Sequence, residues 1–589
     1  MTNPSGIPAD ESPIRDVNRD SRFAIGHFPK DARWLFGAVA LLSLLVYLPS
    51  VFYDFVWDDH RLVKSNSFLD QTNPREIFTR GFAYNPEFGK NEELIPYYRP
   101  LTVLSFFLER KEWNLSPAGY HLTNVILHSL AVFLVCLLLF RLFGSAPGAA
   151  VAGLFFGMNP AINSAVVWIS GRNYLLAMVL LLLAVWLLLQ DLKAEPLYAS
   201  VLGTSLLLAL LAHEAALVVV PLLLLWIVLN RRTFRPVVSW VIAILLVLGG
   251  YLLLRLAIAR IPFPTSILAD ARHQPLLLLN VYGEQVLRLL VPFGQHVIYR
   301  AGPLSRPSVD TALGIAFLLV PIGLALWRRS APATLGAAWL ILFLLPSGNA
   351  MLLGPAGRTL YLAAPGMLML VLAAGDRPHA TSHRLRAWLL TLWAGYAAAC
   401  GVCTVRRNPV WRNEFTLFQT IVKETPDAPG ARLNLGNALQ ERGQTESAIG
   451  QYRAAICLQP DYADPRTRLA FLLLGQNELA GAIEQFRAVV RLEPNSAEAR
   501  NDLALTLKKD GQLDSAIVEY QVALSIEPES ETTLTNLGSV YLAQGDYRSA
   551  TSLFEAALRM SPGFEPARVS LIKAQERAGL ADSTRLPGK

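Results

Sequence analysis

The sequence predicts an all-helical protein in two parts, a bundle of about eleven membrane-spanning helices followed by a solenoid of short helical repeats. Residues 30–405 consist mainly of apolar segments. After them come five prolines, each 34 residues after the one before: Pro426, Pro460, Pro494, Pro528 and Pro562. The whole chain is 53% hydrophobic and only 16% charged, whereas soluble domains carry roughly 25% charge.

About eleven apolar segments in the first part approach the length that a helix needs to cross a bilayer. They cover residues 34–53, 122–143, 148–162, 173–190, 197–212, 214–230, 236–257, 310–327, 333–346, 359–374 and 386–404. Lysine and arginine gather in alternate connections, which by the positive-inside rule places the N-terminus in the cytoplasm. An odd number of spans then places the repeats on the opposite side, in the bacterial periplasm or in the lumen of the endoplasmic reticulum of a eukaryote.

The 34-residue period is typical of the tetratricopeptide repeat, a pair of antiparallel helices. Leu435, Gly436, Ala448, Tyr452 and Pro460 define a pattern that recurs in the three following units. A small residue lets the two helices approach, an aromatic residue fills the space between them, and proline ends the second helix. Such arrays bind extended polypeptide on their concave face, so we expect a protein partner.

These features predict five segments along the chain. They are a disordered cytoplasmic N-terminus (1–29), a multi-span membrane domain (30–405), a linker with a capping helix (406–428), four full repeats with a further capping helix (429–577), and a disordered tail (578–589). The net charge of +7 is spread through the connections, so we read it as a determinant of membrane topology and expect no nucleic-acid partner.

Asp58 and Asp59 follow the first apolar segment directly. Two adjacent carboxylates repel each other, which raises the pKa of one of them and suits a general base. A divalent cation held by these carboxylates is a second reading, and a polar stop after a membrane helix is the third. The sequence does not say which of the two aspartates would act.

Several polar residues lie where the topology predicts the outer face. Arg99, Arg172, Arg300 and Arg358 are each close to a predicted membrane boundary there, and arginine binds phosphate through a planar fork of donors. Snorkelling to lipid headgroups is the alternative for each of them. Glu214 lies between two apolar runs, where a carboxylate is costly unless it is paired or hydrated, so it is a candidate for lining a site.

His121, Asn124 and His128 share one face of a predicted helix. This spacing is compatible with a metal site, but a polar stripe used for helix packing fits it better. The histidines remain candidates for lining a site.

Six motifs in order resemble the transmembrane-and-tetratricopeptide O-mannosyltransferases, a family of the C-type glycosyltransferase superfamily. They are FVWDD (55–59), YYRPLTVLSF (97–106), GYHLTNVILHSL (119–130), NPAINSAVVWISGRNYLLA (159–177), LLAHEAALVVVPLLLL (210–225) and GRTLYLAAPGMLML (357–370). Together with the repeats they cover nearly the whole chain. His213 stands where the family often has lysine, and Asn173 where it often has an acidic residue.

The resemblance implies a C-type membrane fold with its site on the outer face. It implies transfer of mannose or a similar hexose from a polyprenyl-phosphate carrier to a serine or threonine hydroxyl of a protein that the repeats recruit. By the same match, Asp58 or Asp59 is the base, and Arg358 and Tyr361 contact the lipid phosphate. Two alternatives are a glycosyltransferase that acts on lipid or envelope polysaccharide, and a non-catalytic membrane scaffold that displays the repeats.

Overall fold

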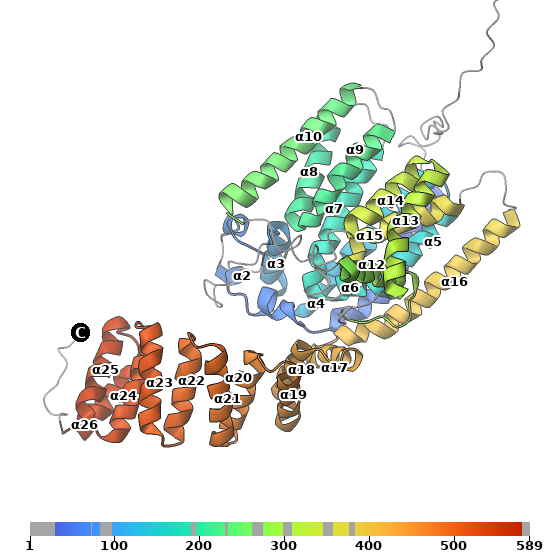
Figure 1. Cartoon of the computed structure of the whole chain (residues 1–589). Helices are drawn as coiled ribbons and strands as arrows, with labels where there is room; N and C mark the ends of the chain where they lie inside the picture. Colours follow the sequence, from blue (N-terminus) through green and yellow to red (C-terminus); the bar gives the residue numbers. More distant parts are fainter. Residues whose placement is uncertain are drawn as a thin grey trace, which may run out of the picture. The chain divides into compact units, whose positions relative to one another are not determined.

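The computed structural model describes residues 30–71, 73–82, 97–189, 196–229, 234–261, 275–298, 309–344, 357–375 and 383–579. Within these ranges the regular elements are helices and there is no β-strand, so the predicted all-α class is confirmed (Figure 1). The N-terminal 1–29 and the end of the predicted tail lie outside the described residues. Contacts divide the chain into two units, Met1–Glu424 and Thr425–Lys589.

The first unit contains a helix for every apolar segment that the sequence predicts. These helices are α1 (Lys30–Tyr47), α4 (Pro117–Phe143), α5 (Ala146–Met158), α7 (Arg172–Leu189), α8 (Pro196–Ala212), α9 (Val219–Leu229), α10 (Phe234–Leu252), α13 (Val309–Arg328), α14 (Ala331–Leu344), α15 (Leu360–Gly375) and α16 (His383–Arg407). In the described ranges, six helices are long and apolar enough to cross a membrane, and a bent pair, Ala146–Met158 with Pro160–Val167, is a seventh candidate.

The remaining four apolar helices of this unit are 10–17 residues long. They are Ala199–Ala212, Glu214–Leu225, Ala331–Leu344 and Leu360–Gly375. The count of eleven spans and the side that each helix end faces therefore stay predictions.

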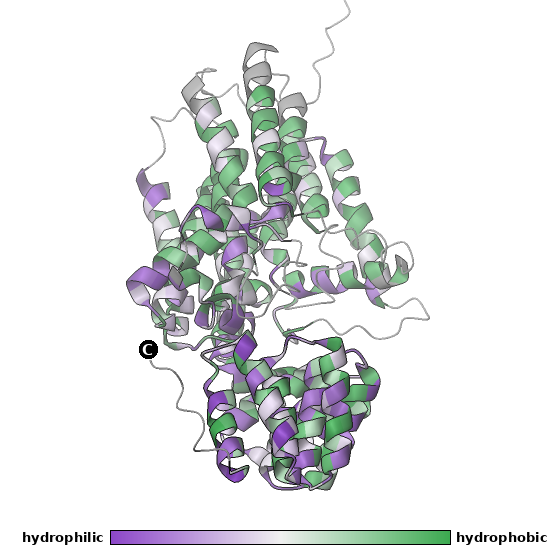
Figure 2. Ribbon diagram, turned by 90° about the vertical axis from the view of Figure 1, so that its left-hand side faces the viewer, coloured by the Kyte–Doolittle hydropathy of each residue, from purple (hydrophilic) through white to green (hydrophobic). Residues whose placement is uncertain are grey.

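The long helices expose apolar side chains, as expected for helices that face lipid. On α13, for example, Leu319 is 62% and Leu326 69% exposed, and on α16 Trp388 is 67% exposed. Figure 2 shows many helices of the first unit coloured as mainly hydrophobic. Because apolar surface of this extent is unfavourable in water, the exposed faces support insertion in a membrane.

Two glycines bring α14 and α15 close together. A Cβ on Gly366 would lie 2.6 Å from the backbone nitrogen of Leu340 and 2.8 Å from the carbonyl oxygen of Gly336. Small residues at helix contacts let backbones approach, which is a common way for membrane helices to associate.

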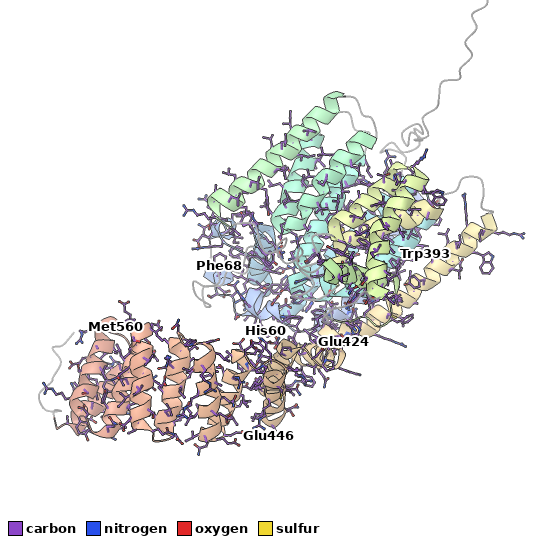
Figure 3. All side chains as sticks on the ribbon, in the orientation of Figure 1. His60, Phe68, Trp393, Glu424, Glu446 and Met560 are labelled. Atoms are coloured by element: carbon purple, nitrogen blue, oxygen red, sulfur yellow. The ribbon has the colours of Figure 1, made fainter. Side chains whose placement is uncertain are left out.

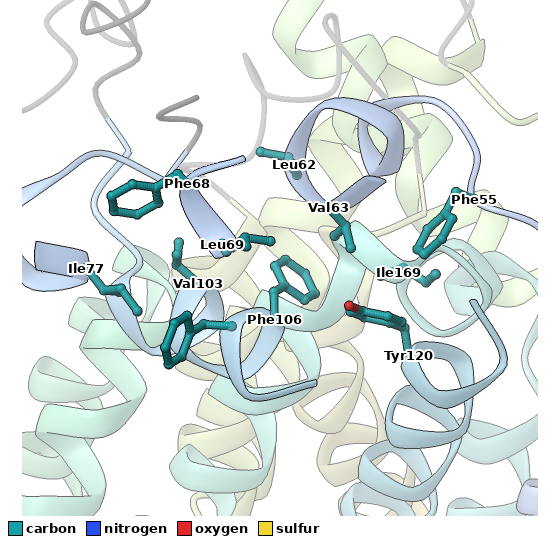
Figure 4. Close-up of a cluster of buried hydrophobic side chains, with 11 residues drawn as sticks. Phe55, Leu62, Val63, Phe68, Leu69, Ile77, Val103, Phe106, Tyr120 and Ile169 are labelled. Carbon is teal, nitrogen blue, oxygen red and sulfur yellow. The ribbon is translucent and has the colours of Figure 1, made fainter. Parts of the chain in front are cut away.

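The connection between α1 and α4, predicted as a long outer loop, has a hydrophobic core of its own. It contains η3 (Leu48–Phe52), η4 (His60–Lys64), α2 (Phe68–Gln71), η5 (Glu76–Thr79) and α3 (Pro100–Trp113). Eleven buried side chains form this core: Phe55, Leu62, Val63, Phe68, Leu69, Ile77, Val103, Phe106, Phe107, Tyr120 and Ile169 (Figure 4). The core fixes the connection to α4 and to η9 (Ile169–Gly171).

The second long connection, between α10 and α13, contains a helix that the sequence did not reveal. This helix is α12 (Pro275–Leu290), which packs along α13, whereas η11 (Leu253–Ile258) falls almost wholly within the predicted apolar segment 236–257. A Cβ on Gly283 of α12 would meet the backbone of Asp310 and Gly314, so the two helices are in close contact.

Beyond α16 the first unit ends with η13 (Asn408–Trp411) and α17 (Glu414–Glu424). Short helices η8 (Pro160–Ile162), α6 (Asn163–Val167) and η10 (Glu214–Val218) complete it. In Figure 1, α2, α3 and α6 lie at one end of the bundle. Asp58 lies two residues before η4, Glu214 is the first residue of η10, and Arg358 lies two residues before α15.

The second unit is a stack of paired helices. They are α18 (Pro429–Glu441) with α19 (Thr445–Leu458), α20 (Ala463–Gly475) with α21 (Leu479–Leu492), α22 (Ala497–Lys509) with α23 (Leu513–Ile526), α24 (Glu531–Gln544) with α25 (Tyr547–Met560), and finally α26 (Glu565–Arg577). Phe554 is fully buried, and a Cβ on Gly538 would lie 2.7 Å from its ring. This is the packing of small and aromatic residues that the repeat pattern predicted.

Candidate functional site

Asp59 is buried, and its hydrogen bonds link the connection after α1 to η9, which directly precedes α7. Its Oδ1 accepts hydrogen bonds from the backbone N–H of Ser170, at 2.8 Å, and from the Ser170 hydroxyl, and its Oδ2 accepts one from the N–H of Val56, at 3.2 Å. Burial raises the pKa of Asp59 to about 7, although the hydrogen bonds from Ser170 and Val56 act to lower it. All of these interactions hold the loop.

Asp58 is half-buried, and its carboxylate accepts no hydrogen bond within the part of the chain that the structure describes. Burial raises the pKa of Asp58, while the nearby charges of Arg358 and Arg61 lower it. Of the two adjacent carboxylates, Asp58 is therefore the one with lone pairs available to an incoming group, and a raised pKa suits it to accept a proton.

Arg358 lies at the start of α15 in the same region. Its guanidinium is 5.5 Å from the centre of the Trp168 ring, and its charge acts on Asp58. Among the described residues, its Nε has no hydrogen-bond partner, and the same holds for Thr359 Oγ1, Ser164 Oγ and Asn163 Nδ2. Buried polar atoms in native proteins are nearly always paired, so this group of orphaned atoms is typical of a site that takes a polar ligand.

Arg99 and Glu214 form a bidentate ion pair that joins the start of α3 to η10. The two bonds are 2.9 Å (Nε to Oε2) and 2.6 Å (Nη2 to Oε1). The Arg99 guanidinium also lies over the rings of Phe82 and Tyr97, at 5.1 and 4.5 Å. Both side chains predicted to face a ligand thus already bind each other.

Arg172 is fully buried at the start of α7 and holds three elements together. It donates to Asn124 Oδ1 at 2.7 Å, to the backbone oxygen of Tyr120 at 2.6 Å, and to the carboxylate of Glu109 on α3. Its ring contact with Phe106 occupies a face of the guanidinium as well, at 5.0 Å.

The two histidines predicted to line a site are buried within the bundle. His128 donates through Nε2 to the Gly157 carbonyl oxygen, at 3.2 Å, and accepts through Nδ1 from the Tyr361 hydroxyl, at 2.9 Å. The His121 ring packs at right angles to Tyr53, at 6.2 Å. Asn124, between them on α4, donates to the backbone oxygens of Val166 and Trp168. His128 and Asn124 are thus used for packing, whereas both ring nitrogens of His121 have no hydrogen-bond partner among the described residues.

The structure brings Asp58, Asp59 and Arg358 to one place, with Arg99 and Glu214 beside them through the shared neighbour Tyr174. Within the described ranges, no three His, Cys, Asp or Glu side chains are placed to hold a metal ion. Arg300 lies outside those ranges.

Comparisons with known proteins found matches to both the membrane part and the repeat part of the chain. Family models of the tetratricopeptide repeat match residues 416–464, 441–505 and 532–561. Protein O-mannosyl-transferase F38B6.6 of Caenorhabditis elegans is 25% identical over 443 residues, which are 72% of this chain and 62% of the relative. Protein O-mannosyl-transferase Tmtc1 of Drosophila melanogaster is 27% identical over 547 residues, 74% of this chain and 62% of the relative.

Over about seven-tenths of its length the chain is therefore similar to protein O-mannosyl-transferases. This confirms the resemblance found in the sequence motifs. The chain spans about three-fifths of the length of the two relatives above. Among solved structures, a crystal structure of MamA protein is 24% identical and matches 27% of this chain and 86% of its own, with a TM-score of 0.26.

Two residues that contact the candidate site were not found from the sequence. Ser170 and Trp168 lie 111 and 109 residues beyond Asp59, and only the fold shows that they contact the Asp58–Asp59 loop. Glu109, the partner of Arg172, carried a usable signal, because a lone carboxylate on an apolar helix face requires a partner.

Proposed function

We propose that the chain is an integral-membrane glycosyltransferase that moves a hexose from a polyprenyl-phosphate carrier to serine or threonine hydroxyls of proteins. The similar proteins are named O-mannosyl-transferases, which favours mannose as the hexose. The observation that carries this proposal is that the charge of Arg358 acts on Asp58 while both groups keep polar atoms without a partner among the described residues. Within the described ranges, the Asp58 carboxylate accepts no hydrogen bond and the Arg358 Nε has no partner. The first can accept a proton and the second can bind a phosphate.

In this reaction Asp58 is the general base. The acceptor hydroxyl attacks the sugar carbon in line, the new carbon–oxygen bond forms as the bond to the carrier phosphate breaks, and configuration inverts. The hydroxyl proton passes to the Asp58 carboxylate, and polyprenyl phosphate leaves. Burial favours this role, since it raises the pKa of Asp58 from its ordinary value toward that of a useful base.

Arg358 binds the carrier phosphate and stabilises the charge that develops on it as it leaves. Its guanidinium is oriented by Trp168, and the hydroxyls of Ser164 and Thr359 and the amide of Asn163 lie among the unpaired groups. Donors placed before the reaction at the site of developing charge are among the most effective contributions an enzyme makes. Tyr361, fully buried and bonded to His128, links the first turn of α15 to α4.

The remaining predicted residues act by positioning. Asp59 holds the loop through Ser170, the Arg99–Glu214 pair joins α3 to η10, and Arg172 holds α3, α4 and α7 together through Glu109, Asn124 and Tyr120. In the proposal none of them contacts the sugar. Arg99 and Arg172 each already bind a carboxylate of the protein, so the proposal assigns the phosphate to Arg358.

The repeats would supply the acceptor. Their unit contains a groove of about 470 Å³ lined by residues of α18, α20, α21 and α22, including Asn437, Arg468, Phe471, Glu493 and Asp502. Burial and the neighbouring Glu498 raise the pKa of Asp502 to about 6. Polar grooves of this kind bind extended chains through their backbone and side-chain groups, so the groove is the proposed place of capture, on the periplasmic or lumenal side.

The experiment that tests this function uses purified membranes containing the full chain and a polyprenyl-phosphate mannose with a labelled sugar. Label should appear on serine or threonine of protein, and its transfer should require the carrier phosphate. Label found only on lipid or polysaccharide would favour the alternative acceptor class. If no more label is transferred than in membranes that lack the chain, the proposed enzyme activity is contradicted and the non-catalytic scaffold is favoured.

A further inference from the structure

We infer that Glu414, outside the membrane bundle on α17, is a positioning residue for Asp58. This inference rests on the proposed role of Asp58 as the base. Family models assign residues from 416 onward to the tetratricopeptide repeat, but contacts place α17 in the membrane unit, where it packs against the connection that bears the two aspartates.

Trp57, the residue before Asp58, has a left-handed backbone, with φ of 56°. A residue with a Cβ adopts this conformation only at a cost, so its surroundings must hold it there. Because the carboxylate of Asp58 receives no hydrogen bond of its own within the described residues, the direction in which it points depends on the backbone at Trp57.

Glu414 supplies the contact that holds this backbone. Its Oε1 accepts a hydrogen bond from the N–H of Trp57, at 3.2 Å, and lies 3.4 Å from Nε2 of His60. The same nitrogen of His60 is 3.0 Å from the carbonyl oxygen of Phe55. One carboxylate therefore reaches both sides of the Asp58–Asp59 pair.

Other residues of the segment from η13 to α17 contact the same loop, which bears Asp58 and Asp59. The Phe418 ring is 5.5 Å from the Trp57 ring, Trp411 is 6.0 Å from Trp168, and the N–H of Asp54 donates to the carbonyl oxygen of Arg412 at 3.0 Å. Further along α17, Glu424 accepts from Arg407 at 3.0 Å and from the N–H of Val297 at 2.8 Å. Figure 3 labels His60 and Glu424 among the side chains of this end of the unit.

These contacts give the two ends of α17 different roles. Glu424 anchors the helix to the bundle, whereas Glu414 acts on the turn that aims Asp58. Asp59 is already held by its hydrogen bonds from Ser170. The Glu414 contact therefore affects the position of Asp58, whose carboxylate accepts no hydrogen bond within the described residues. Removing the Glu414 carboxylate should displace Asp58 without changing the binding of phosphate at Arg358.

The test compares Glu414→Ala, Glu414→Gln and the exposed control Gln419→Ala on the same helix, with transfer measured on the full chain in membranes. We expect Glu414→Ala to lower kcat at least about tenfold, because small misplacements of a catalytic group are costly, with donor KM changed less than about twofold. Glu414→Gln should restore most of kcat, since its amide oxygen still accepts from Trp57. Gln419→Ala should match the unchanged chain.

Unchanged kcat in Glu414→Ala would overturn the inference while leaving the proposed function intact, provided that Asp58→Asn is inactive. An active Asp58→Asn would instead overturn the proposed base. An equal loss in Glu414→Gln would also contradict the inference. If Glu414→Ala does not fold, Glu414→Leu, of similar volume, takes its place, and failure of both would show a purely structural role.

Discussion

Ser170 donates two hydrogen bonds to a single oxygen of Asp59, one from its backbone N–H and one from its hydroxyl. The bond pair joins the turn after α1 to the turn before α7 and occupies the carboxylate that is next in sequence to the proposed base. It separates the roles of two adjacent aspartates that the sequence alone presents as equivalent.

Asp59 should make the stability of the protein depend on pH. Its pKa is raised to about 7 in the folded chain, above the unfolded value near 4, so its ionisation works against folding. Stability is fullest below the unfolded pKa and is lost as the pH rises through about 7. Between about pH 5 and pH 8 we expect a loss on the order of 2 kcal/mol from this group.

Melting curves of the purified protein, followed by tryptophan fluorescence at several pH values, check this effect. Asp59→Asn cannot ionise and should show a flatter pH dependence than the unchanged chain. Identical slopes for the two proteins would show that Asp59 is not buried as a titrating group.

The Arg99–Glu214 pair should be worth more as a pair than as its separate members. Changing Arg99→Met alone leaves a carboxylate that is largely buried without its partner, which costs about 3 kcal/mol or more. The double variant Arg99→Met with Glu214→Leu should recover much of that loss, because it leaves no unpaired charge. Comparing melting temperatures of the two single variants and the double variant measures the coupling, and additive losses would contradict it.

Arg358 should control donor binding. Arg358→Ala removes charge-assisted hydrogen bonds to phosphate, so we expect the Kd of a polyprenyl-phosphate ligand to rise about 10- to 100-fold. The exposed Arg384, at the start of α16, is a matched control, and Arg384→Ala should bind normally. A normal Kd in Arg358→Ala would move the phosphate site elsewhere.

The close approach of α14 and α15 can be tested with alanine. Gly366→Ala places a methyl group against the backbone of Leu340 and Gly336, and overpacking of this kind costs about 1–3 kcal/mol. Gly395 on α16 has nothing within 4 Å of its Cβ position, so Gly395→Ala should leave the melting temperature unchanged or slightly raised. Equal behaviour of the two variants would mean that the helices are further apart.

The fold class and the repeats were predictable from the sequence because both depend on local patterns. The 34-residue spacing of the prolines and the small and aromatic residues before them report helix pairs directly. The apolar segments likewise report helices, although α12 went unrecognised within a predicted loop because it is amphipathic and interrupted by polar residues.

The sequence identified candidate residues of the site but did not predict which of them contact one another. Arg172 and Arg358 both follow a glycine near a predicted membrane boundary, yet the first is fully buried against Glu109 and the second is half-buried with an unpaired Nε among the described residues. Their difference comes from partners far apart in the chain. The same is true of His128 and Tyr361, which bond across 233 residues, and of Glu414 with Trp57.

The central claim is that Asp58 removes the proton from the acceptor hydroxyl. It is tested most directly by the initial rate of labelled sugar transfer to protein from a polyprenyl-phosphate donor, using equal amounts of folded Asp58→Asn, Asp59→Asn and unchanged chain. Loss of a general base costs about 100-fold or more, so Asp58→Asn should be nearly inactive while Asp59→Asn retains measurable transfer. Full activity in Asp58→Asn would contradict the account.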